Sequence, residues 1–349
     1  MKKGIQRILL IRTDRIGDVI LTTPMISLLH KEYPEAELYF LTRAYTAPLL
    51  GHHQYLHQTI IYDPEGKHKG VIGHLRLARM LKKLEVDTAF LFFPTYNLAY
   101  SLRCAGIKYR IGTGYRWYSF LLNNRIFEHR KFGLKHELEY NLSLLKNFIA
   151  SPPTADQVRF DFQFDEELKK LKHKILQEND LKDNYLIIHP GSGGSAPNLS
   201  PEMFSRIIEY LSEKIQLPIF LVGSKSEKSL IGGIAQDNKY SHLIKITGEW
   251  DLESYMAMIA GSKLFISNST GPLHIARAFD IPLIAFYCPA IPCSPRRWGP
   301  YNQIQSVLQP DVEPCKTGNP RTCPHGNCLD FIKWEDIKNI LDKRLEEIS

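Results

Sequence analysis

Long apolar runs are missing from this sequence, and none approaches the ~18 residues that a membrane-spanning helix requires. The N-terminus is basic, but the apolar stretch Ile8–Ile11 that follows is too short for the core of a signal peptide. Glycine (22) and proline (21) follow no period, which excludes a collagen-like or low-complexity chain. Cysteine is scarce, at six residues. We therefore expect a soluble intracellular protein with reduced thiols.

Motifs for divalent cations are also missing. The sequence contains no Asp-x-Asp motif and no other obvious acidic cluster for Mg²⁺, so a diphosphate ligand would have to be bound by backbone dipoles and side chains. The rest is ordinary globular composition, with 44% hydrophobic and 23% charged residues, and a net charge of +7. The 349 residues suffice for about two domains, each with its own core.

Short apolar runs alternate with amphipathic stretches, which predicts parallel strands joined by crossover helices. In the first half we predict strands at 7–11, 38–41, 59–62, 88–93 and 109–112, and helices at about 17–33, 75–84 and 137–149. In the second half we predict strands at 185–189, 219–222, 243–246, 264–267 and 283–286, and helices at 201–215, 252–259, 273–279 and 334–348. The fold class is therefore α/β.

The proline-containing segment 150–156 separates the two halves and is the best candidate for a linker. Domains over 1–150 and 157–332 follow from it. Two α/β halves imply a cleft between them, and in such sheets ligands bind beyond the carboxyl ends of the strands. The loops that follow the strands are therefore where we expect functional residues.

The loop after the first strand ends with Gly17 and Asp18. Gly17 permits a tight turn and close approach of the backbone, and Asp18 falls in the first turn of the following helix. An acid at that position complements the helix dipole. It is also a carboxylate at the carboxyl end of a strand, where it is placed to act as a general base. The two interpretations are compatible.

The loop His189–Ala196 formally matches the Gly-x-Gly-x-x-Ala fingerprint of dinucleotide-binding proteins. The match is weak, because that fingerprint requires the glycines to open the helix directly. Here the helix starts later, with Ser200 as its N-cap and Pro201 at its first position. The backbone N–H groups of the loop and the Ser192 hydroxyl are suited to phosphate oxygens instead.

A third loop, Ser267–His274, again lies between a strand and a helix. The hydroxyls of Ser269 and Thr270, the glycine Gly271 and the N–H groups of the helix N-terminus predict an anion site that needs no metal. Ordinary helix capping by Ser269 or Thr270 is the alternative. Two such loops in one half favour a diphosphate ligand more than either does alone.

Basic residues outnumber acids seven to one between Lys108 and Lys135, where Glu128 is the acid. One interpretation is a solvated basic face. The other is a contact for anionic groups on a substrate or on a membrane surface. The aromatic residues among them form no recognisable nucleic-acid-binding module, so we expect no nucleic-acid partner.

Taken together, the motifs resemble glycosyltransferase family 9, the lipopolysaccharide heptosyltransferases. The matching segments are Ile11–Val19 with Pro24, Lys135–Leu145, His189–Gly193, Ser267–His274 and Arg297–Pro300. The resemblance runs from residue 8 to about 332 and implies a GT-B fold, in which two Rossmann-like domains with parallel sheets face a central cleft. The acceptor would bind domain 1–150 and the nucleotide-sugar donor domain 157–332, and helix 333–349 would pack back on the first domain.

The resemblance also implies inverting, metal-independent transfer from an ADP-heptose-type donor, without a cofactor. Asp18 matches the proposed general base of the family. Residues of the two glycine loops match the donor-phosphate-binding positions: Ser192, Gly193, Ser269, Thr270, Gly271 and His274. Glu227 is a candidate for the nucleotide, through its ribose. Arg15, Arg110 and Arg116 are candidates for the anionic groups of the acceptor.

Two departures from the family pattern affect these loops. The family commonly carries Lys or Arg in the phosphate loop where this chain has Pro197 and Leu199, so one cationic side chain for the leaving group is absent. In many heptosyltransferases an Asp precedes the Thr-Gly pair, and here that residue is Ser269. Asp18 is retained, so the transfer chemistry stays available.

The cysteines allow a metal hypothesis. Cys315, Cys323 and Cys328, together with His325, carry the ligand atoms that zinc prefers. The spacing is looser than in the usual zinc knuckle, and reduced structural thiols are the alternative that we favour. We therefore assign no metal site from the sequence.

Our prediction is a glycosyltransferase that adds a sugar, heptose on the resemblance, to a lipopolysaccharide-core or related glycan acceptor. It would act in the cytoplasm, at the inner face of the cytoplasmic membrane. Two alternatives stay open: a catalytically silent relative that binds glycans or nucleotide sugars, and an NAD-dependent oxidoreductase or epimerase. The latter requires a glycine turn that opens a helix and an acid that ends the next strand, and the sequence has neither.

Overall fold

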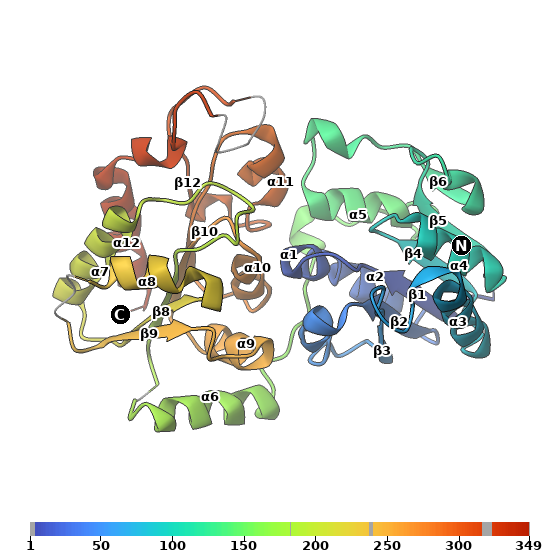
Figure 1. Cartoon of the computed structure of the whole chain (residues 1–349), viewed down its shortest axis with the longest axis horizontal. Helices are drawn as coiled ribbons and strands as arrows, with labels where there is room; N and C mark the ends of the chain where they lie inside the picture. Colours follow the sequence, from blue (N-terminus) through green and yellow to red (C-terminus); the bar gives the residue numbers. More distant parts are fainter. Residues whose placement is uncertain (1–3, 182, 237–239, 316–322, 349) are drawn as a thin grey trace. The chain divides into compact units, whose positions relative to one another are not determined.

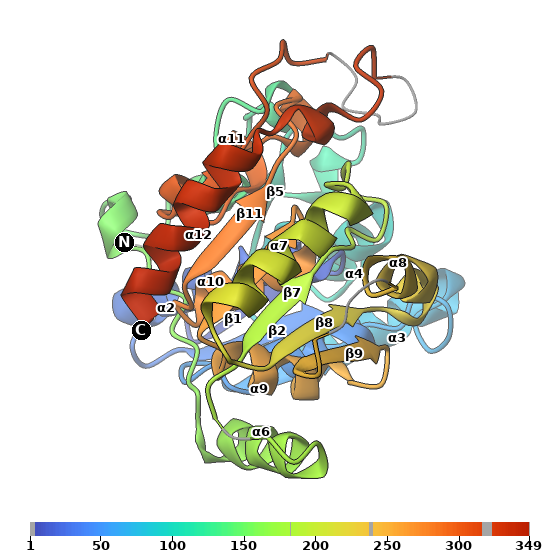
Figure 2. The same ribbon diagram turned by 90° about the vertical axis from the view of Figure 1, so that its left-hand side faces the viewer.

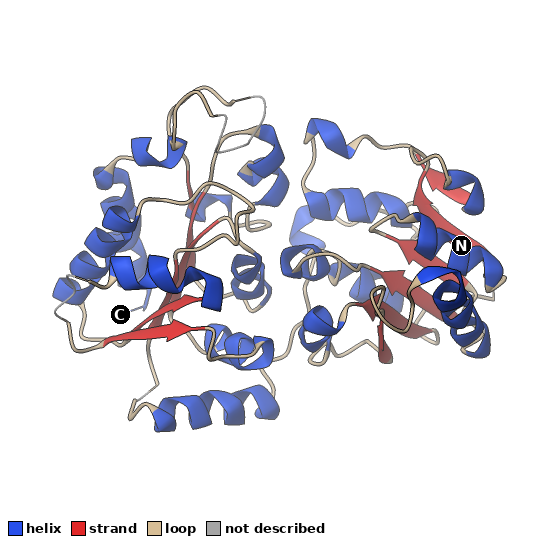
Figure 3. Ribbon diagram, in the orientation of Figure 1, coloured by secondary structure: helices blue, strands red, loops and turns tan. Residues whose placement is uncertain are grey.

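The computed structural model describes residues 4–181, 183–236, 240–315 and 323–348. The chain divides into two compact units, Met1–Gln163 and Phe164–Ser349 (Figure 1). The division falls shortly after the predicted linker 150–156. Within each unit, strands and helices alternate along the chain (Figure 3). The basic residues Lys2 and Lys3 lie outside the described part.

The N-terminal unit is built on a six-stranded sheet whose paired strands are all parallel, in the order β3-β2-β1-β4-β5-β6. The strands are β1 (Arg7–Ile11), β2 (Glu37–Thr42), β3 (Gln58–Ile61), β4 (Thr88–Leu91), β5 (Tyr109–Thr113) and β6 (Asn124–Ile126). β1 lies between β2 and β4, and its residues Ile8–Ile11 are fully buried. A strand buried on both faces has a continuous apolar sequence, which is why the pattern predicted it.

The helices of this unit are α1 (Ile16–Ile20), α2 (Pro24–Glu32), α3 (Gly70–Lys83), α4 (Tyr96–Cys104) and α5 (Glu137–Leu145). The single helix predicted over 17–33 is wrong, because a break at residues 21–23 divides it into α1 and α2. Pro24 cannot donate to the preceding turn and instead occupies the start of α2. α3 and α4 cover one face of the sheet through buried leucines such as Leu77, Leu81, Leu98 and Leu102.

The C-terminal unit repeats this topology with a second parallel sheet, in the order β12-β11-β10-β7-β8-β9. The strands are β7 (Leu186–His189), β8 (Ile219–Gly223), β9 (Leu243–Thr247), β10 (Leu264–Asn268), β11 (Leu283–Phe286) and β12 (Val307–Leu308). The helices are α6 (Glu166–Glu178), α7 (Pro201–Lys214), α8 (Lys228–Ile234), α9 (Leu252–Ala260), α10 (Gly271–Ala278), α11 (Pro295–Trp298) and α12 (Trp334–Ile348). Among the described residues of both units, no helix combines the length and the apolar character needed to cross a bilayer.

Helix α12 packs on the C-terminal unit, beside α7 and over one face of its sheet (Figure 2). Ile337, Leu341 and Leu345 fall on one side of the helix and are buried in the same core as the strand residues. The hydroxyl of Tyr210 on α7 donates to Asp342 on α12. The apolar face of α12 is thus buried within its own unit, and the packing of helix 333–349 on the first domain, which the family resemblance implied, stays a prediction.

Both sheets have the strand order of a Rossmann-like domain, with the first strand of the unit beside the fourth. In the N-terminal unit β1 pairs with β4, and in the C-terminal unit β7 pairs with β10. At these positions the strand order reverses, and ligands of open α/β sheets bind at the carboxyl ends of the strands there. The loops after β1, β7 and β10 are therefore in the positions that a ligand would occupy.

Candidate active site

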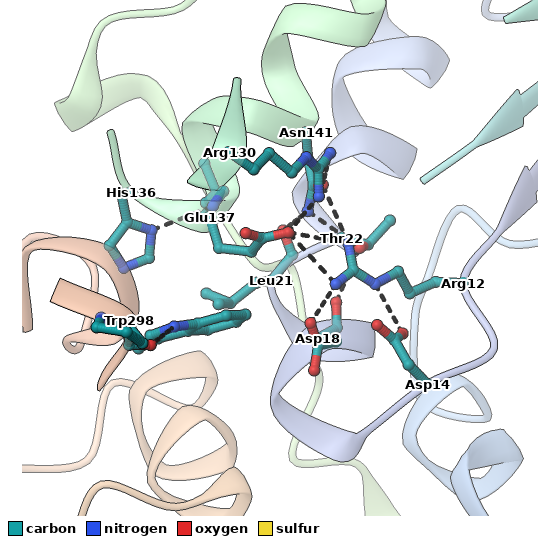
Figure 4. Close-up of polar contacts among 12 residues, drawn as sticks. Arg12, Asp14, Asp18, Leu21, Thr22, Arg130, His136, Glu137, Asn141 and Trp298 are labelled. Carbon is teal, nitrogen blue, oxygen red and sulfur yellow. Dashed lines mark hydrogen bonds and ion pairs between the residues drawn. The ribbon is translucent and has the colours of Figure 1, made fainter. Parts of the chain in front are cut away.

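Five charged side chains gather at the carboxyl end of β1 in the N-terminal unit (Figure 4). We call them the Arg12 cluster; its members are Arg12, Asp14, Asp18, Arg130 and Glu137. Arg12 directly follows β1, and its backbone N–H continues the sheet by donating to the Leu41 carbonyl at 3.1 Å. The strand thereby fixes where the Arg12 side chain starts.

The guanidinium of Arg12 is the centre of this cluster, and the residue is only 3% exposed. Its Nε donates to Asp14 at 2.7 Å, and its Nη2 donates to Oδ1 of Asp18. Its Nη1 lies 3.3 Å from Oε1 of Glu137 and 3.3 Å from Oδ1 of Asn141. A planar guanidinium with a fixed fork of donors is suited to holding several carboxylates in one geometry.

Helix α5 supplies the other side of the cluster. His136 caps this helix by accepting a hydrogen bond from the Leu138 N–H at 3.2 Å, which places Glu137 in the first turn, where a carboxylate is favoured. Arg130 forms a second ion pair with Glu137 and donates to Asn141 at 3.3 Å. Glu137 is therefore shared between two arginines.

Asn141 connects α5 to the break between α1 and α2. Its Nδ2 donates to the Leu21 carbonyl and to the Thr22 hydroxyl, both at 3.1 Å. The Thr22 hydroxyl in turn donates to the Asp18 carbonyl at 2.8 Å. The short helix that carries Asp18 is thus held by hydrogen bonds at its own end as well as by Arg12.

The cluster contains three carboxylates and two guanidinium groups, so with all five charged it carries one excess negative charge. Burial, together with the negative charges of Asp14 and Glu137, raises the pKa of Asp18 to about 6, against the opposing attraction of Arg12. In the described part of the chain, only Oδ1 of this carboxylate takes part in a hydrogen bond, and its partner is Arg12. Oδ2 is left to accept a proton, and a base with a pKa near the operating pH is effective.

The predicted acceptor-binding arginines have different surroundings. Arg15 and Arg116 are exposed, with their guanidinium groups on the surface of the N-terminal unit. Arg110 is partly buried, and its side chain donates to the carbonyls of Leu121 (2.8 Å) and Ile107. The first bond connects β5 to the segment that follows it, and the second connects β5 to the residue Ile107 before it. Arg110 therefore has a structural role that the sequence did not reveal.

Sequence analysis identified Asp18 but assigned no role to Arg12, Arg130, Glu137 or Asn141. Arg12 and Glu137 are 125 positions apart in the chain, so local pattern analysis does not bring them together. A signal was nevertheless present, because both lie in segments that carry the family resemblance.

In the C-terminal unit, His189 ends β7 and is buried. Its Nδ1 lies 2.8 Å from the Tyr255 hydroxyl, and burial lowers its pKa to about 4, so the ring is neutral at physiological pH. Ser192 is also buried, and its hydroxyl donates to the Ala196 carbonyl at 2.8 Å, which closes the loop on itself. The Ser192 hydroxyl therefore shapes this loop.

Glu227 lies against this glycine loop. Its Oε1 accepts from the Gly193 N–H at 3.3 Å, and its Oε2 accepts from the N–H and the hydroxyl of Ser224, both at 2.8 Å. A Cβ on Gly191 would come within 1.8 Å of Oε1, so a larger residue there would have to displace the Glu227 carboxylate. These hydrogen bonds lower the pKa of Glu227, although burial opposes them.

The loop after β10 continues into α10 through Thr270, whose backbone is extended. The Thr270 side chain makes no capping hydrogen bond, so the ordinary capping role considered for it is not what the structure shows. Ser269 is partly buried beside it, and His274 is buried in α10. The first N–H groups of α10, starting at Gly271, have no partner within the helix and are suited to an anion.

Asn268 fixes the two loops of the C-terminal unit to each other. It is fully buried, its Oδ1 accepts from the Leu199 N–H at 2.9 Å, and its Nδ2 donates to the Pro190 carbonyl. Leu199 is itself buried in the core, so the position where the family commonly has a cation serves packing in this chain. The structure thus brings together, in one unit, the two loops that the sequence predicted as phosphate-binding.

Two Rossmann-like units, each with a six-stranded parallel sheet, define the GT-B class of glycosyltransferase folds. The chain belongs to glycosyltransferase family 9 (heptosyltransferase), whose family model matches residues 74–328. The predicted family and fold class are therefore confirmed, and the chain is a glycosyltransferase. This membership favours transfer chemistry over the NAD-dependent oxidoreductase or epimerase considered from the sequence.

Individual proteins agree with this assignment. A Haemophilus influenzae protein named as a glycosyltransferase is 30% identical over 311 residues, which are 87% of this chain and 88% of that protein. The crystal structure of a family 9 glycosyltransferase from Veillonella parvula is similar over 99% of both chains, with a TM-score of 0.87 and 19% identity. The Escherichia coli ADP-heptose lipopolysaccharide heptosyltransferase II is similar over 98% of this chain and 99% of its own, with a TM-score of 0.78 and 19% identity.

Proposed function

We propose that this glycosyltransferase transfers a heptose from an ADP-heptose donor to a lipopolysaccharide-core or related glycan acceptor, with inversion at the anomeric carbon. The donor and acceptor classes follow the name of the structurally similar E. coli enzyme. The observation that carries the proposal is the Arg12 cluster, in which burial, together with the negative charges of Asp14 and Glu137, raises the pKa of Asp18 to about 6 against the attraction of Arg12. A general base for a sugar hydroxyl needs this property.

In the proposed reaction, Oδ2 of Asp18 removes the proton from the acceptor hydroxyl. The acceptor oxygen attacks the anomeric carbon of the donor as the bond between that carbon and the diphosphate oxygen breaks. One C–O bond forms on the face opposite the one that breaks, so the configuration inverts, and ADP leaves with the electron pair. Arg12 holds the Asp18 carboxylate in place through Oδ1 and stabilises its charged form.

The leaving diphosphate is assigned to the loops after β7 and β10, without a metal ion. Backbone N–H groups at the start of α10 and the Thr270 hydroxyl are the proposed donors, with Ser192, Gly193, Ser269, Gly271 and His274 around them. Such preorganised dipoles stabilise developing negative charge without reorganisation during the reaction. Because the Gly193 N–H donates to Glu227, we propose that Glu227 shapes the nucleotide side of this loop and contacts the ribose with its remaining acceptor capacity.

The acceptor is assigned to the N-terminal unit, with the exposed Arg15 and Arg116 as contacts for its anionic groups. Arg110 is less suited to this role, because two backbone carbonyls already accept its hydrogen bonds. An acceptor of this class is a glycolipid, so we propose that the protein works at the inner face of the cytoplasmic membrane as a peripheral protein. The basic segment Lys108–Lys135 supplies the positive charge that an anionic surface attracts.

The test of the proposal is the variant Asp18→Asn. Asparagine keeps an oxygen that accepts from Arg12 but cannot take up a proton, so we expect the initial rate of heptose transfer to fall by about 10²–10⁴-fold. The matched control is Asp14→Asn in the same loop, because Asp14 binds the same guanidinium through Nε. We expect this control to lose at most about tenfold, as it disturbs Arg12 without removing the base.

Thermal unfolding of both variants establishes that they are folded. An alternative outcome is that the wild-type protein binds donor and acceptor without transferring sugar, with the same binding in Asp18→Asn. That result would mean that the protein is a catalytically silent relative. If Asp14→Asn and Asp18→Asn lost the same activity, Asp18 would not be the base. The Arg12 cluster would then have a structural role only.

A further inference from the structure

Tyr287 directly follows β11, and its side chain is fully buried in the C-terminal unit. Its backbone N–H donates to the Leu308 carbonyl at 3.0 Å, which extends the pairing of β11 with β12. A buried phenol needs partners for its hydroxyl group, because an unpaired polar group away from water costs free energy. The partners of this hydroxyl therefore decide what Tyr287 does in the fold.

The first partner is α11. The Tyr287 hydroxyl donates to the carbonyl of Trp298 at 2.6 Å, and Trp298 is the last residue of that helix, where a carbonyl has no partner within the helix. Burial raises the pKa of Tyr287, so the phenol keeps its single proton at physiological pH. A carbonyl oxygen can only accept, so this proton is used in the bond to Trp298. The Tyr287 oxygen can therefore form a further hydrogen bond only as an acceptor.

The second partner is Ser269, at the end of the neighbouring strand. β10 and β11 pair in parallel up to Asn268 and Phe286, and the Ser269 N–H continues the pairing by donating to the Phe286 carbonyl at 3.1 Å. Ser269 and Tyr287 come one position further along each strand, so their side chains fall on the same face of the sheet. The two side chains form a hydrogen bond. Because the Tyr287 oxygen can only accept, Ser269 is the donor.

The direction of this bond determines what Ser269 offers to a ligand. A serine hydroxyl has one proton and two lone pairs, so a serine whose proton is already donated presents lone pairs only. The ionised oxygens of a diphosphate also only accept, whereas a sugar hydroxyl can donate. Ser269 is partly buried, and beside it Thr270, which makes no capping hydrogen bond, is the proposed hydroxyl donor to the diphosphate. Two adjacent hydroxyl groups thus suit two different parts of a nucleotide sugar.

We propose that Tyr287 is a positioning residue for the donor: by accepting the proton of Ser269, it keeps that hydroxyl as an acceptor for an O–H group of the donor sugar. This role rests on the function proposed above, since it requires a nucleotide sugar at the loop after β10. Ser269, which the resemblance grouped with the phosphate-binding residues, then recognises the sugar. Tyr287 is fully buried and acts through Ser269.

The test is the affinity of Tyr287→Phe for ADP-heptose and for ADP, measured by isothermal titration calorimetry on the full-length protein. Phenylalanine keeps the buried ring but releases the Ser269 proton, so the serine hydroxyl is no longer held as an acceptor. The Kd of ADP-heptose should rise by about three- to tenfold, the effect of one hydrogen bond, while the Kd of ADP, which lacks the transferred sugar, should change by less than about twofold. Ser269→Ala should show the same difference between the two ligands. The double variant should bind ADP-heptose no more weakly than Ser269→Ala alone, because Tyr287 acts through Ser269.

Tyr185→Phe is the matched control. Tyr185 is also fully buried in this unit, and its hydroxyl donates to the backbone carbonyl of Met258 at 2.8 Å. Both tyrosine variants should lose a similar amount of thermal stability, but Tyr185→Phe should bind ADP and ADP-heptose as the wild type does. Equal weakening of both ligands in Tyr287→Phe, or additive effects of Tyr287→Phe and Ser269→Ala, would overturn the proposal. If Tyr287→Phe fails to fold, an unchanged affinity of Ser269→Ala for ADP-heptose overturns it.

The same titrations distinguish the role of Tyr287 from the identity of the donor. If the wild type prefers a GDP- or UDP-sugar, ADP-heptose is not the donor. The difference expected for Tyr287→Phe then applies to that nucleotide sugar and its own nucleoside diphosphate. If the wild type binds no nucleotide sugar, both the proposed function and the role of Tyr287 are wrong.

Discussion

Asp18 illustrates how the residues around a carboxyl group set its pKa. Alone in water, an aspartate is fully ionised at neutral pH. In the Arg12 cluster, burial and the charges of Asp14 and Glu137 work against ionisation, while Arg12 works for it. Because Arg12 also pairs with Asp14 and Glu137, its positive charge is divided among three carboxylates and does not cancel the effects that raise the pKa. The result is a carboxylate that ionises close to physiological pH.

The rate of transfer should therefore depend on pH with an acid limb at about 6. Below the pKa of Asp18 the base is protonated, so kcat/KM should fall about tenfold per pH unit, and above it the rate should reach a plateau. The measurement is initial rate against pH at low substrate concentration.

In Glu137→Gln one of the causes that raise the pKa of Asp18 is removed, so the acid limb of the pH profile should move to lower pH. A limb that moves upward or stays in place would contradict this account of the cluster.

At the scale of elements, the break between α1 and α2 places Asp18 in a short helix whose end is held from α5. The sequence supplied part of this, since Pro24 within an apolar pattern is a signal for a helix boundary, yet the pattern over 17–33 was continuous enough to predict one helix. The sequence alone does not show which residue forms hydrogen bonds with the backbone at this break. The Leu21 carbonyl is bound by Asn141, 120 positions away, and that pairing exists only in the folded unit.

The same distinction explains the remaining differences between expectation and structure. Strands such as β1 and β7 are mainly apolar, and their ends were predicted to within a residue. A strand that is buried on both faces has a continuous apolar sequence, which is easy to recognise. The short strands β6 and β12 were not predicted, since their few residues depend on neighbours more than on their own pattern. Helices α8 and α11 were also missed, as were α4 and α6, although α4 and α6 begin at the side-chain N-caps Thr95 and Asp165. Asp18, Thr270 and Gly271 were proposed from the sequence because they follow strands. Arg12 also follows a strand, but its pairing with Glu137, 125 positions away, exists only in the folded unit.

The segment after β5 is an element with a second property, since it exposes aromatic side chains among its basic residues. Trp117 is 74% exposed and Phe120 66% exposed. Trp117 stacks on Tyr96 with ring centroids 5.1 Å apart, and Lys131 lies over the ring of Phe132. Exposed aromatic rings with cations around them are typical of surfaces that bind the interface of an anionic membrane.

We expect the protein to sediment with vesicles that contain phosphatidylglycerol, and much less with vesicles of phosphatidylcholine alone. The double variant Trp117→Ser, Phe120→Ser should weaken this binding by at least about tenfold, because each ring contributes about 1.5–3 kcal/mol when fully buried. The matched control is Ile72→Ser, which removes an apolar side chain that is 75% exposed on α3 in the same unit. Equal loss in the control would mean that no particular surface binds the membrane.

At the scale of the whole molecule, the two units share one topology but differ in the chemistry of their loops. In the N-terminal unit the loop after the first strand leads to a cluster of carboxylates and arginines. In the C-terminal unit the loop after β7 and the loop after β10 are joined by Asn268 and are rich in glycine and hydroxyl groups. The first set suits proton transfer and the second suits a diphosphate.

This division predicts how nucleotide sugars affect thermal stability. A donor at about 100 times its Kd stabilises the folded state by about 2.7 kcal/mol, which for a unit of this size raises Tm by about 5–10 °C. We expect this shift with ADP-heptose, a much smaller one with GDP- and UDP-sugars, and none with NAD.

The variant Thr270→Val removes a hydroxyl that makes no capping hydrogen bond, so its Tm without ligand should be close to that of the wild type. Its increase in Tm with ADP-heptose should be smaller than that of the wild type. A larger shift with a UDP- or GDP-sugar would assign a different donor, and a full shift in Thr270→Val would remove that hydroxyl from the diphosphate site.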